Sequence, residues 1–338
     1  MSAVRGRRRI PPVAFGETRA PEIPAPSLAR RLRAWPRDLL KQALHEILRR
    51  LPVGFAPRLG RLLAPLVQRM NGSRIFARRI AWNLDRLHAA GPLSGTAHAE
   101  ALARWWKGAG AVFAEYATLE RLGAAGRLEI DDPEGSIAAL PRDGPAVFAC
   151  VHLGPFELCF ETILNRLGRE AVGTWQPEPS NASNAILARL RARYGIFAFP
   201  PGQRSARHLH RLVVTEGFDA ILFVDEVRDR QVHLPAFGRD LPARGNAVTA
   251  VKLALKTGAP LVPVHVLRTG TAQYRFVVGA PLVFDREGLE SLAVSGGVVA
   301  LDRYFDPLVR AHVEQWYMLP ELRLPGFVAR PPGDAAAQ

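Results

Sequence analysis

The pattern of apolar and polar positions changes near residue 125 of the 338-residue chain. Before that point, apolar residues recur at the three- and four-residue spacing of helices that bury one face. Beyond it, short apolar runs alternate with helical segments, which is typical of a mainly parallel sheet covered by helices on both faces. We therefore expect an α/β fold with an N-terminal helical region. The expected helices are 36–51, 58–70, 76–87, 97–122, 156–167, 182–194, 205–216, 246–257 and 299–318, and the expected strands are 146–151, 171–175, 196–199, 219–224, 261–267 and, at the edge of the sheet, 274–278.

The same pattern predicts four segments along the chain. Residues 1–35 are rich in Arg and Pro and have no periodicity at their start, so we expect a disordered tail there. Residues 36–125 form the amphipathic helical region, and residues 126–327 form the α/β core. A second disordered tail is expected at 328–338.

The charge of the chain predicts an anionic partner. There are 45 basic and 31 acidic residues, for a formal net charge of +14, which suits nucleic acid, an anionic membrane or an acidic protein. The basic start of the chain has no apolar run after it, so we expect no export signal. No apolar run reaches the roughly 18 residues that cross a bilayer, so any membrane contact is expected to be peripheral. Helices 36–51 and 58–70 mix Leu with Arg, a pattern that fits either a membrane interface or packing on the core.

The stretch FACVHLGPFELCF, residues 148–160, holds the first candidate chemistry. His152 follows a predicted buried strand, Gly154 and Pro155 form a turn, and a helix is expected to begin beside them. Ligands of α/β sheets bind outside the carboxyl ends of strands. An imidazole there can act as a general base, and we expect Glu157 to bond its other nitrogen and orient it. This spacing alone is a weak signal.

Five blocks in order resemble a known family. HLGPFE, 152–157, is similar to the HxxxxE/D motif of the lysophospholipid acyltransferase superfamily, and specifically to that block of the bacterial lipid A late acyltransferases of the lauroyl and myristoyl type. The other blocks are RRIAWNL at 78–84, LARLRARYGI at 187–196, the segment 218–268 with AFG and GAPLVPV, and VEQWYMLPELR at 313–323. The resemblance covers roughly residues 40–325 and implies a glycerolipid acyltransferase-like fold.

The resemblance also implies an activity. An acyl chain would pass from a thioester on acyl carrier protein or coenzyme A to a hydroxyl of a lipid A precursor-like glycolipid at the cytoplasmic face of the bacterial inner membrane. His152 would be the base and Glu157 its orienting group, with no acyl-enzyme, cofactor or metal. The acyl thioester is then a co-substrate, and no nucleic-acid partner is expected.

The same resemblance suggests substrate-binding positions. Asp225 and Arg228 stand in the third block, where an Arg can hold an acceptor phosphate, and Arg191 or a neighbouring Arg can do likewise. Gly238 fits a turn of the family. The remaining positions are Arg244, at the start of a helix whose N-terminus suits an anion, and Gln176, which stands where the family often has Arg.

Alternative interpretations remain open at this stage. The acceptor could be a lysophospholipid or an aminolipid, and a non-enzymatic membrane- or nucleic-acid-binding protein would also explain the charge. Two weaker alternatives are Cys159 as a nucleophile, which we expect to point into the core, and a metal site at residues 225–233, whose spacing matches no tight ligand set. Cys150 and Cys159 indicate no disulfide framework.

Overall fold

The computed structural model describes residues 28–328 except 89–90, 92, 94, 177–179, 201 and 286. Both predicted tails therefore lie mostly outside the described residues. The first helix, α2, spans Leu28–Arg50. It thus begins at Leu28 rather than at the boundary expected at residue 36, and the helical region is longer than the periodicity predicted.

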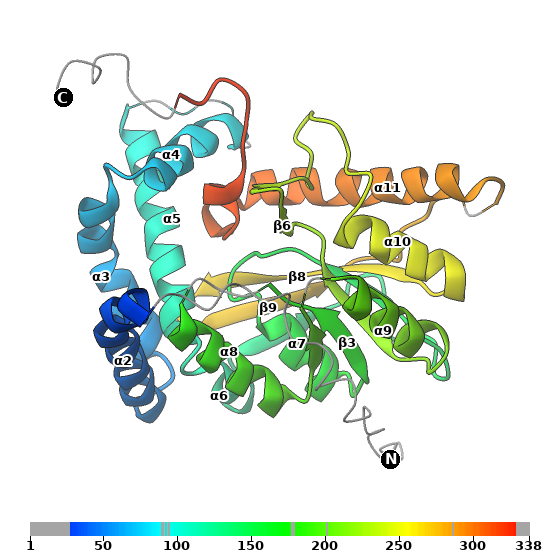
Figure 1. The fold of residues 1–338 in the computed structure, drawn as a ribbon, viewed down its shortest axis with the longest axis horizontal. Coiled ribbons are helices and arrows are strands. Elements are labelled where there is room, and N and C mark those ends of the chain that lie inside the picture. The colour runs from blue at the N-terminus through cyan, green and yellow to red at the C-terminus, as the bar shows by residue number, and fades with distance from the viewer. Residues whose placement is uncertain are drawn as a thin grey trace.

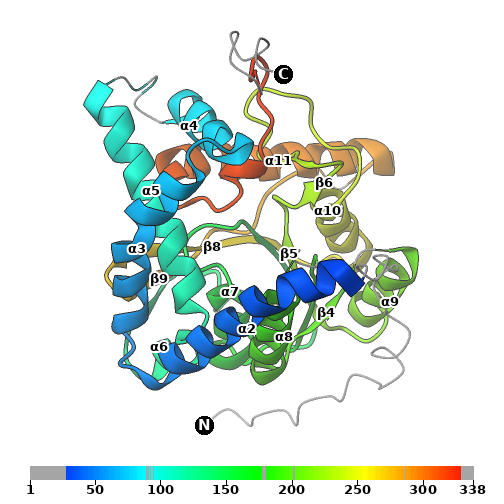
Figure 2. The ribbon, with the colours of Figure 1, turned by 60° about the vertical axis from the view of Figure 1, so that its left-hand side comes forward.

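The N-terminal region is helical, as expected. After α2 come α3 (Phe55–Asn71), α4 (Ile75–Leu87), α5 (Gly95–Glu115) and α6 (Leu119–Ala124). Figure 2 shows α3 beside α5 and α2 beside α8 (Asn181–Tyr194). The helix expected at 97–122 is in fact two helices, because the chain turns after Glu115, whose side chain is fully buried.

A mainly parallel sheet of seven strands forms the core, which confirms the predicted fold class. The strands are β1 (Leu128–Asp131), β2 (Val147–Cys150), β3 (Ala171–Thr174), β4 (Phe197–Phe199), β5 (Asp219–Phe223), β8 (Leu261–Gly270) and β9 (Gln273–Val278). Their order is β1-β9-β8-β2-β5-β3-β4, and only the β8–β9 pair is antiparallel. The expectation that 274–278 would be an edge strand is wrong, because β1 pairs with β9 from outside.

Helices cover both faces of the sheet (Figure 1). They are α7 (Leu158–Glu161), a π turn (Thr162–Arg166), α8, α9 (Gln203–Val214), α10 (Asn246–Thr257) and α11 (Glu290–Ala311). Strand β2 shows why both faces of the sheet need a layer of helices. Val147 and Ala149 join the apolar cluster that includes α9, α10 and α11, whereas Phe148 and Cys150 join the cluster on the opposite face with α7 and α8.

The segment after α11 connects the sheet to the N-terminal helices. It contains the 3-10 turns Val313–Gln315 and Leu319–Glu321. The buried Asn83 amide of α4 donates to the carbonyls of Leu319 and Leu322 at 2.9 Å each. The Trp105 indole of α5 donates to the carbonyl of Trp316 at 2.9 Å. The helical region and the α/β core are therefore joined by buried hydrogen bonds rather than by a linker alone.

Candidate active site

The turn after β2 places His152 at the carboxyl edge of the sheet. β2 ends at Cys150, and the turn continues through Gly154, which has a φ of +52°. A Cβ at Gly154 would lie 2.9 Å from the Val266 carbonyl oxygen of β8, so only glycine fits both the conformation and the space. The glycine thus lets the turn lie directly against the neighbouring strand.

Asp225 is the partner of the histidine. Its Oδ1 lies 2.7 Å from His152 Nδ1, and its Oδ2 accepts the backbone N–H of His152 at 2.8 Å. The two residues meet because β2 and β5 are parallel neighbours, with Cys150 opposite Phe223, and each side chain follows its strand by two residues. The Asp225 side chain is fully buried and that of His152 is 15% exposed.

This contact selects the tautomer of the neutral imidazole. A carboxylate only accepts a hydrogen bond, so in the neutral ring Nδ1 carries the hydrogen and Nε2 keeps its lone pair. Within the described part of the chain, no residue bonds His152 Nε2. The ring lies 4.5 Å from Phe156 and 4.3 Å from Phe223, measured between ring centroids. An imidazole held in this way by a carboxylate, and set among aromatic rings, can act as a base.

Glu157 does not make the contact expected of it. Its carboxylate is fully buried and is held bidentately by Arg191 of α8, with Arg191 Nε at 3.2 Å from Oε2 and Nη2 at 2.5 Å from Oε1. The structure therefore corrects two expectations at once. Asp225, rather than Glu157, bonds the imidazole, and Arg191 bonds Glu157 instead of standing free for a phosphate. The pair joins the turn after β2 to α8.

The third block is also arranged differently from the expectation. Glu226 Oε1 accepts the backbone N–H of Asn246 at 2.6 Å, so a carboxylate of the chain occupies the N-terminus of α10 that was expected to suit an anion. Burial raises the pKa of Glu226. Gly245 has a φ of +109°, and a Cβ there would lie 3.1 Å from Arg228 Nη1. Glu226 therefore fastens the short hairpin of β6 (Val227–Arg228) and β7 (Gln231–Val232) to α10. Arg228 lies in this hairpin, and its Nε and Nη1 are buried with no hydrogen-bond partner among the described residues.

The other predicted binding residues are spread around the same edge of the sheet. Gln176 is exposed two residues beyond the end of β3. Gly238, with a φ of +81°, turns the loop that follows β7. Arg244 is exposed, and its Nη2 lies 3.2 Å from Asp229 Oδ2. The structure does not bring these three into contact with His152.

The rival sites find no support in the geometry. Cys159 is fully buried in the apolar cluster with α7 and α8, where a substrate does not reach its thiol. Among the described residues, no group of three or more His, Cys, Asp or Glu side chains is arranged to hold a metal ion. None of the described helices combines the length and hydropathy that crossing a bilayer requires.

Trp316 is the residue of this site that the sequence analysis missed. Its indole Nε1 donates to Asp225 Oδ2 at 2.9 Å, and the side chain is fully buried. The residue lies in the block VEQWYMLPELR, which was recognised only as a closing element. A buried indole N–H needs an acceptor, and that requirement is the signal that could have drawn attention to it.

Comparison with known families identifies the family of the chain. The family of bacterial lipid A biosynthesis acyltransferases matches residues 28–323. A search of curated proteins found no match. The chain belongs to the bacterial lipid A biosynthesis acyltransferase family. It is accordingly an O-acyltransferase, and the predicted family and enzyme class are confirmed.

Proposed function

We propose that the protein transfers a fatty acyl chain from an acyl thioester, carried by acyl carrier protein or coenzyme A, to a hydroxyl of a lipid A precursor-like glycolipid. His152 is the general base and Asp225 the carboxylate that orients it. The observation that carries this proposal is the 2.7 Å contact between His152 Nδ1 and Asp225 Oδ1 at the carboxyl edge of the sheet, in a chain of this acyltransferase family.

The geometry supports direct transfer of the acyl group from the thioester to the acceptor hydroxyl. Nε2 takes the proton of the acceptor hydroxyl while the oxygen attacks the thioester carbonyl. Asp225 stabilises the imidazolium that forms. The tetrahedral intermediate then collapses, the carbon–sulfur bond breaks, and the imidazolium returns its proton to the leaving thiolate. The products are an ester and a free thiol, and no acyl-enzyme or cofactor is needed.

A row of aromatic rings supports an apolar substrate. Phe156 contacts the imidazole, Tyr317 follows at 5.5 Å from Phe156, and Phe113 of α5 follows at 5.8 Å from Tyr317, all between ring centroids. Phe113 is 56% exposed. The rings therefore extend from the base to the surface beside α3, where a hydrocarbon chain finds apolar contact.

The surface of α2 and α3 supports work at a membrane. Large apolar side chains are exposed along both helices, and we call this set the α2–α3 apolar surface: Trp35, Leu39, Leu40, Leu44, Ile47, Phe55, Leu62, Leu63, Leu66, Val67 and Met70. Exposed basic residues accompany them, among them Arg37, Lys41, Arg58 and Arg69. Apolar contact plus basic charge is the signature of helices that lie in an anionic interface. We propose peripheral binding to the cytoplasmic face of the inner membrane, where both the acceptor lipid and the thioester are available.

The decisive experiment is mass spectrometry of the lipid products formed by purified protein, with acyl carrier protein and coenzyme A thioesters as donors. The acceptors are under-acylated lipid A, lysophospholipids and aminolipids. We expect acyl addition to the lipid A precursor, and a loss of at least about a hundredfold in His152→Ala and in Asp225→Asn, since general-base catalysis contributes about that much or more. His210→Ala, at an exposed histidine of α9, is the matched control and retains activity.

Glu157→Gln separates the two carboxylates. We expect it to lower the melting temperature, because it removes the buried carboxylate charge with which Arg191 pairs, while the folded enzyme keeps most of its kcat. Full activity of His152→Ala would refute the base assignment. An active Asp225→Asn beside an inactive, folded Glu157→Gln would return the orienting role to Glu157. Addition only to a lysophospholipid or an aminolipid would change the acceptor, and no addition by folded protein would favour a binding protein.

A further inference from the structure

The carboxylate that orients His152 is itself held by a residue from the far end of the chain. We propose that Trp316 is a positioning residue for acyl transfer: its indole N–H fixes the rotation of the Asp225 carboxylate so that Oδ1 faces His152 Nδ1. This inference rests on the proposed role of His152 and Asp225 as base and orienting acid.

The first argument is the hydrogen bonding of the buried carboxylate. Oδ2 accepts from His152 N at 2.8 Å and from Trp316 Nε1 at 2.9 Å, whereas Oδ1 accepts from the imidazole at 2.7 Å. Asp225 is fully buried, so solvent does not replace a lost donor. With both donors in place, rotation of the carboxyl group would break bonds at Oδ2, and Oδ1 stays directed at Nδ1.

The second argument is that the backbone around Trp316 also fixes the backbone of the base. Tyr317 N donates to the His152 carbonyl at 2.9 Å, and Gly154 N donates to the Gln315 carbonyl at 3.1 Å. An isolated β-bridge joins Leu153 to Trp316. The three residues 315–317 therefore hold the catalytic turn and the orienting carboxylate together as one unit.

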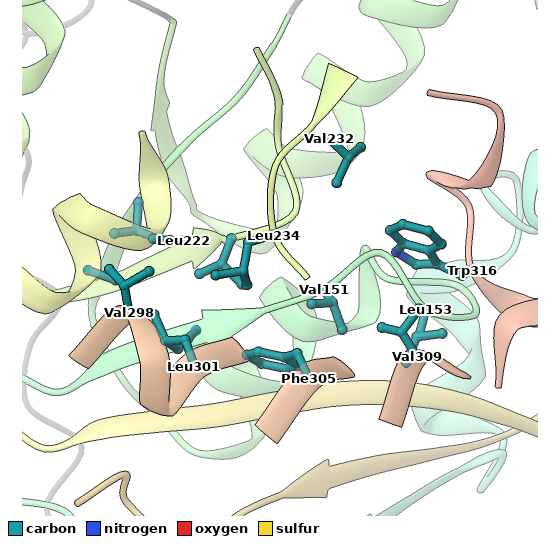
Figure 3. Packing of buried hydrophobic residues seen from close by; sticks show 14 of the residues in the cluster. Val151, Leu153, Leu222, Val232, Leu234, Val298, Leu301, Phe305, Val309 and Trp316 are labelled. Atoms are coloured by element: carbon teal, nitrogen blue, oxygen red, sulfur yellow. The ribbon is translucent and has the colours of Figure 1, made fainter. Parts of the chain in front are cut away.

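The third argument concerns how firmly Trp316 is placed. The side chain lies beside Leu153 and Val309 in the apolar cluster, as Figure 3 shows. Its ring makes an edge contact with Phe237, with 5.5 Å between centroids. Such packing leaves the indole one orientation, so the N–H is directed at Asp225 before any substrate binds.

If Trp316 had only a structural role, its indole N–H would not need to donate to Asp225. Trp105 is also a buried tryptophan of the same cluster, and its N–H is satisfied by a backbone carbonyl, that of Trp316. The two residues thus form a matched pair. Each buries an indole and donates one hydrogen bond, but only Trp316 donates to the group that bonds the imidazole.

The test compares Trp316→Phe with Trp105→Phe in the acyl-transfer assay. We expect Trp316→Phe to lower kcat by about tenfold to a hundredfold, the effect of removing one hydrogen bond to a charged group. KM should stay within about twofold, because a fully buried side chain does not touch the substrate. Trp105→Phe should leave kcat within about twofold even where the melting temperature falls.

Two further measurements keep the test independent of folding. Trp316 replaced by 3-benzothienylalanine keeps the ring shape and removes the N–H, and we expect the same loss of kcat with an unchanged circular dichroism spectrum. In the proton NMR spectrum, the low-field resonance of the His152 Nδ1 proton, assigned by its disappearance in His152→Ala, should shift or broaden in both Trp316 variants and not in Trp105→Phe.

The outcomes distinguish this inference from the proposed function. Wild-type kcat in the benzothienylalanine protein, with His152→Ala inactive, overturns the role of Trp316 and leaves the base assignment standing. Equal losses in Trp105→Phe and Trp316→Phe, with an unmoved resonance, also overturn it, because the segment would then act only through folding. Activity in His152→Ala would instead refute the proposed function itself.

Discussion

At the scale of single residues, a second histidine makes the fold sensitive to acid. His265 of β8 is 3% exposed, its Nδ1 bonds no residue in the described ranges, and burial, with a smaller effect of His312, lowers its pKa to about 3. The folded chain therefore keeps this imidazole neutral at pH values where the unfolded chain, with an ordinary pKa near 6.5, takes up a proton.

The expected result is a loss of stability as the pH falls. Between about pH 6.5 and about pH 3, only the unfolded state takes up a proton at His265. In this range the free energy of unfolding falls by roughly 1 kcal/mol for each unit by which the pH is lowered. His265→Leu should remove the part of the acid sensitivity that comes from this histidine. The free energy of unfolding, measured by urea denaturation at pH 7, 6 and 5, should therefore fall less steeply toward low pH in the variant than in the wild type. Parallel curves would contradict this account, and His210→Ala supplies the comparison for an exposed histidine.

The structure places His152 just beyond the end of a buried strand, as the sequence predicted, but the partner predicted for it is wrong. His152 was identified because a titratable group after a buried strand is costly unless it is used. Its partner was placed at Glu157, five positions away, whereas Asp225 is 73 positions away in sequence. Spacing along one segment cannot reveal which strand lies next to it, and strand order alone brings Asp225 to the imidazole.

At the scale of elements, helix α11 shows how a local rule can hide a helix. It was predicted at 299–318 but spans Glu290–Ala311. The first turns were missed because two adjacent glycines, Gly296 and Gly297, are unfavourable in the interior of a helix. The structure explains one of them. A Cβ at Gly297 would lie 2.4 Å from Val251 Cγ1 of α10, whereas a Cβ at Gly296 meets nothing within 4 Å. Gly297 is therefore the point where two helices approach closely.

These neighbouring glycines yield opposite predictions. Gly296→Ala should raise the free energy of unfolding by up to about 1 kcal/mol, since alanine is the better helix former. Gly297→Ala should lower it by about 1–3 kcal/mol, because the methyl group forces α10 and α11 apart. Chemical denaturation of the two variants checks both signs. Stabilisation by both substitutions would mean that the helices do not pack as closely as described.

Strand pairing shows the same limit of sequence reasoning. Strands β2, β5 and β8 were predicted because each is a short apolar run, buried along most of its length. Strand β1 was missed, since LEID alternates like many exposed segments. Its pairing with β9 depends on long-range placement that periodicity does not contain, and so 274–278 was wrongly assigned to the edge.

At the scale of the whole molecule, helices α2 and α3 and the start of helix α11 lie at opposite sides of the ribbon in Figure 1. This separation provides a test of membrane binding. Leu62 and Leu66, one helical turn apart on α3, are 76% and 56% exposed; Val283 and Leu289, near the start of α11, are 94% and 70% exposed. Both pairs are apolar and accessible, but only the first belongs to the proposed membrane surface.

We expect the double variant Leu62→Gln/Leu66→Gln to bind vesicles of phosphatidylglycerol and phosphatidylethanolamine at least about tenfold more weakly in co-sedimentation, because the interface no longer buries two leucines. Val283→Gln/Leu289→Gln should bind like wild type. Acyl transfer to vesicle-borne acceptor should fall with binding, while transfer to detergent-dispersed acceptor should persist. Equal binding by all three proteins would remove the membrane role of α2 and α3.

The late position of the segment that holds the catalytic turn has a consequence for biosynthesis. Residues 315–317 contact the turn through Gln315, Trp316 and Tyr317, and they follow every strand of the sheet in the sequence. On the ribosome, the strands that carry His152 and Asp225 are made first, and the residues that fix their geometry emerge later. On the proposed role of Trp316, a nascent chain that has paired its strands but lacks residues 315–317 consumes thioester at least about tenfold more slowly than the finished chain. Full activity would then require that these late residues have docked on the turn.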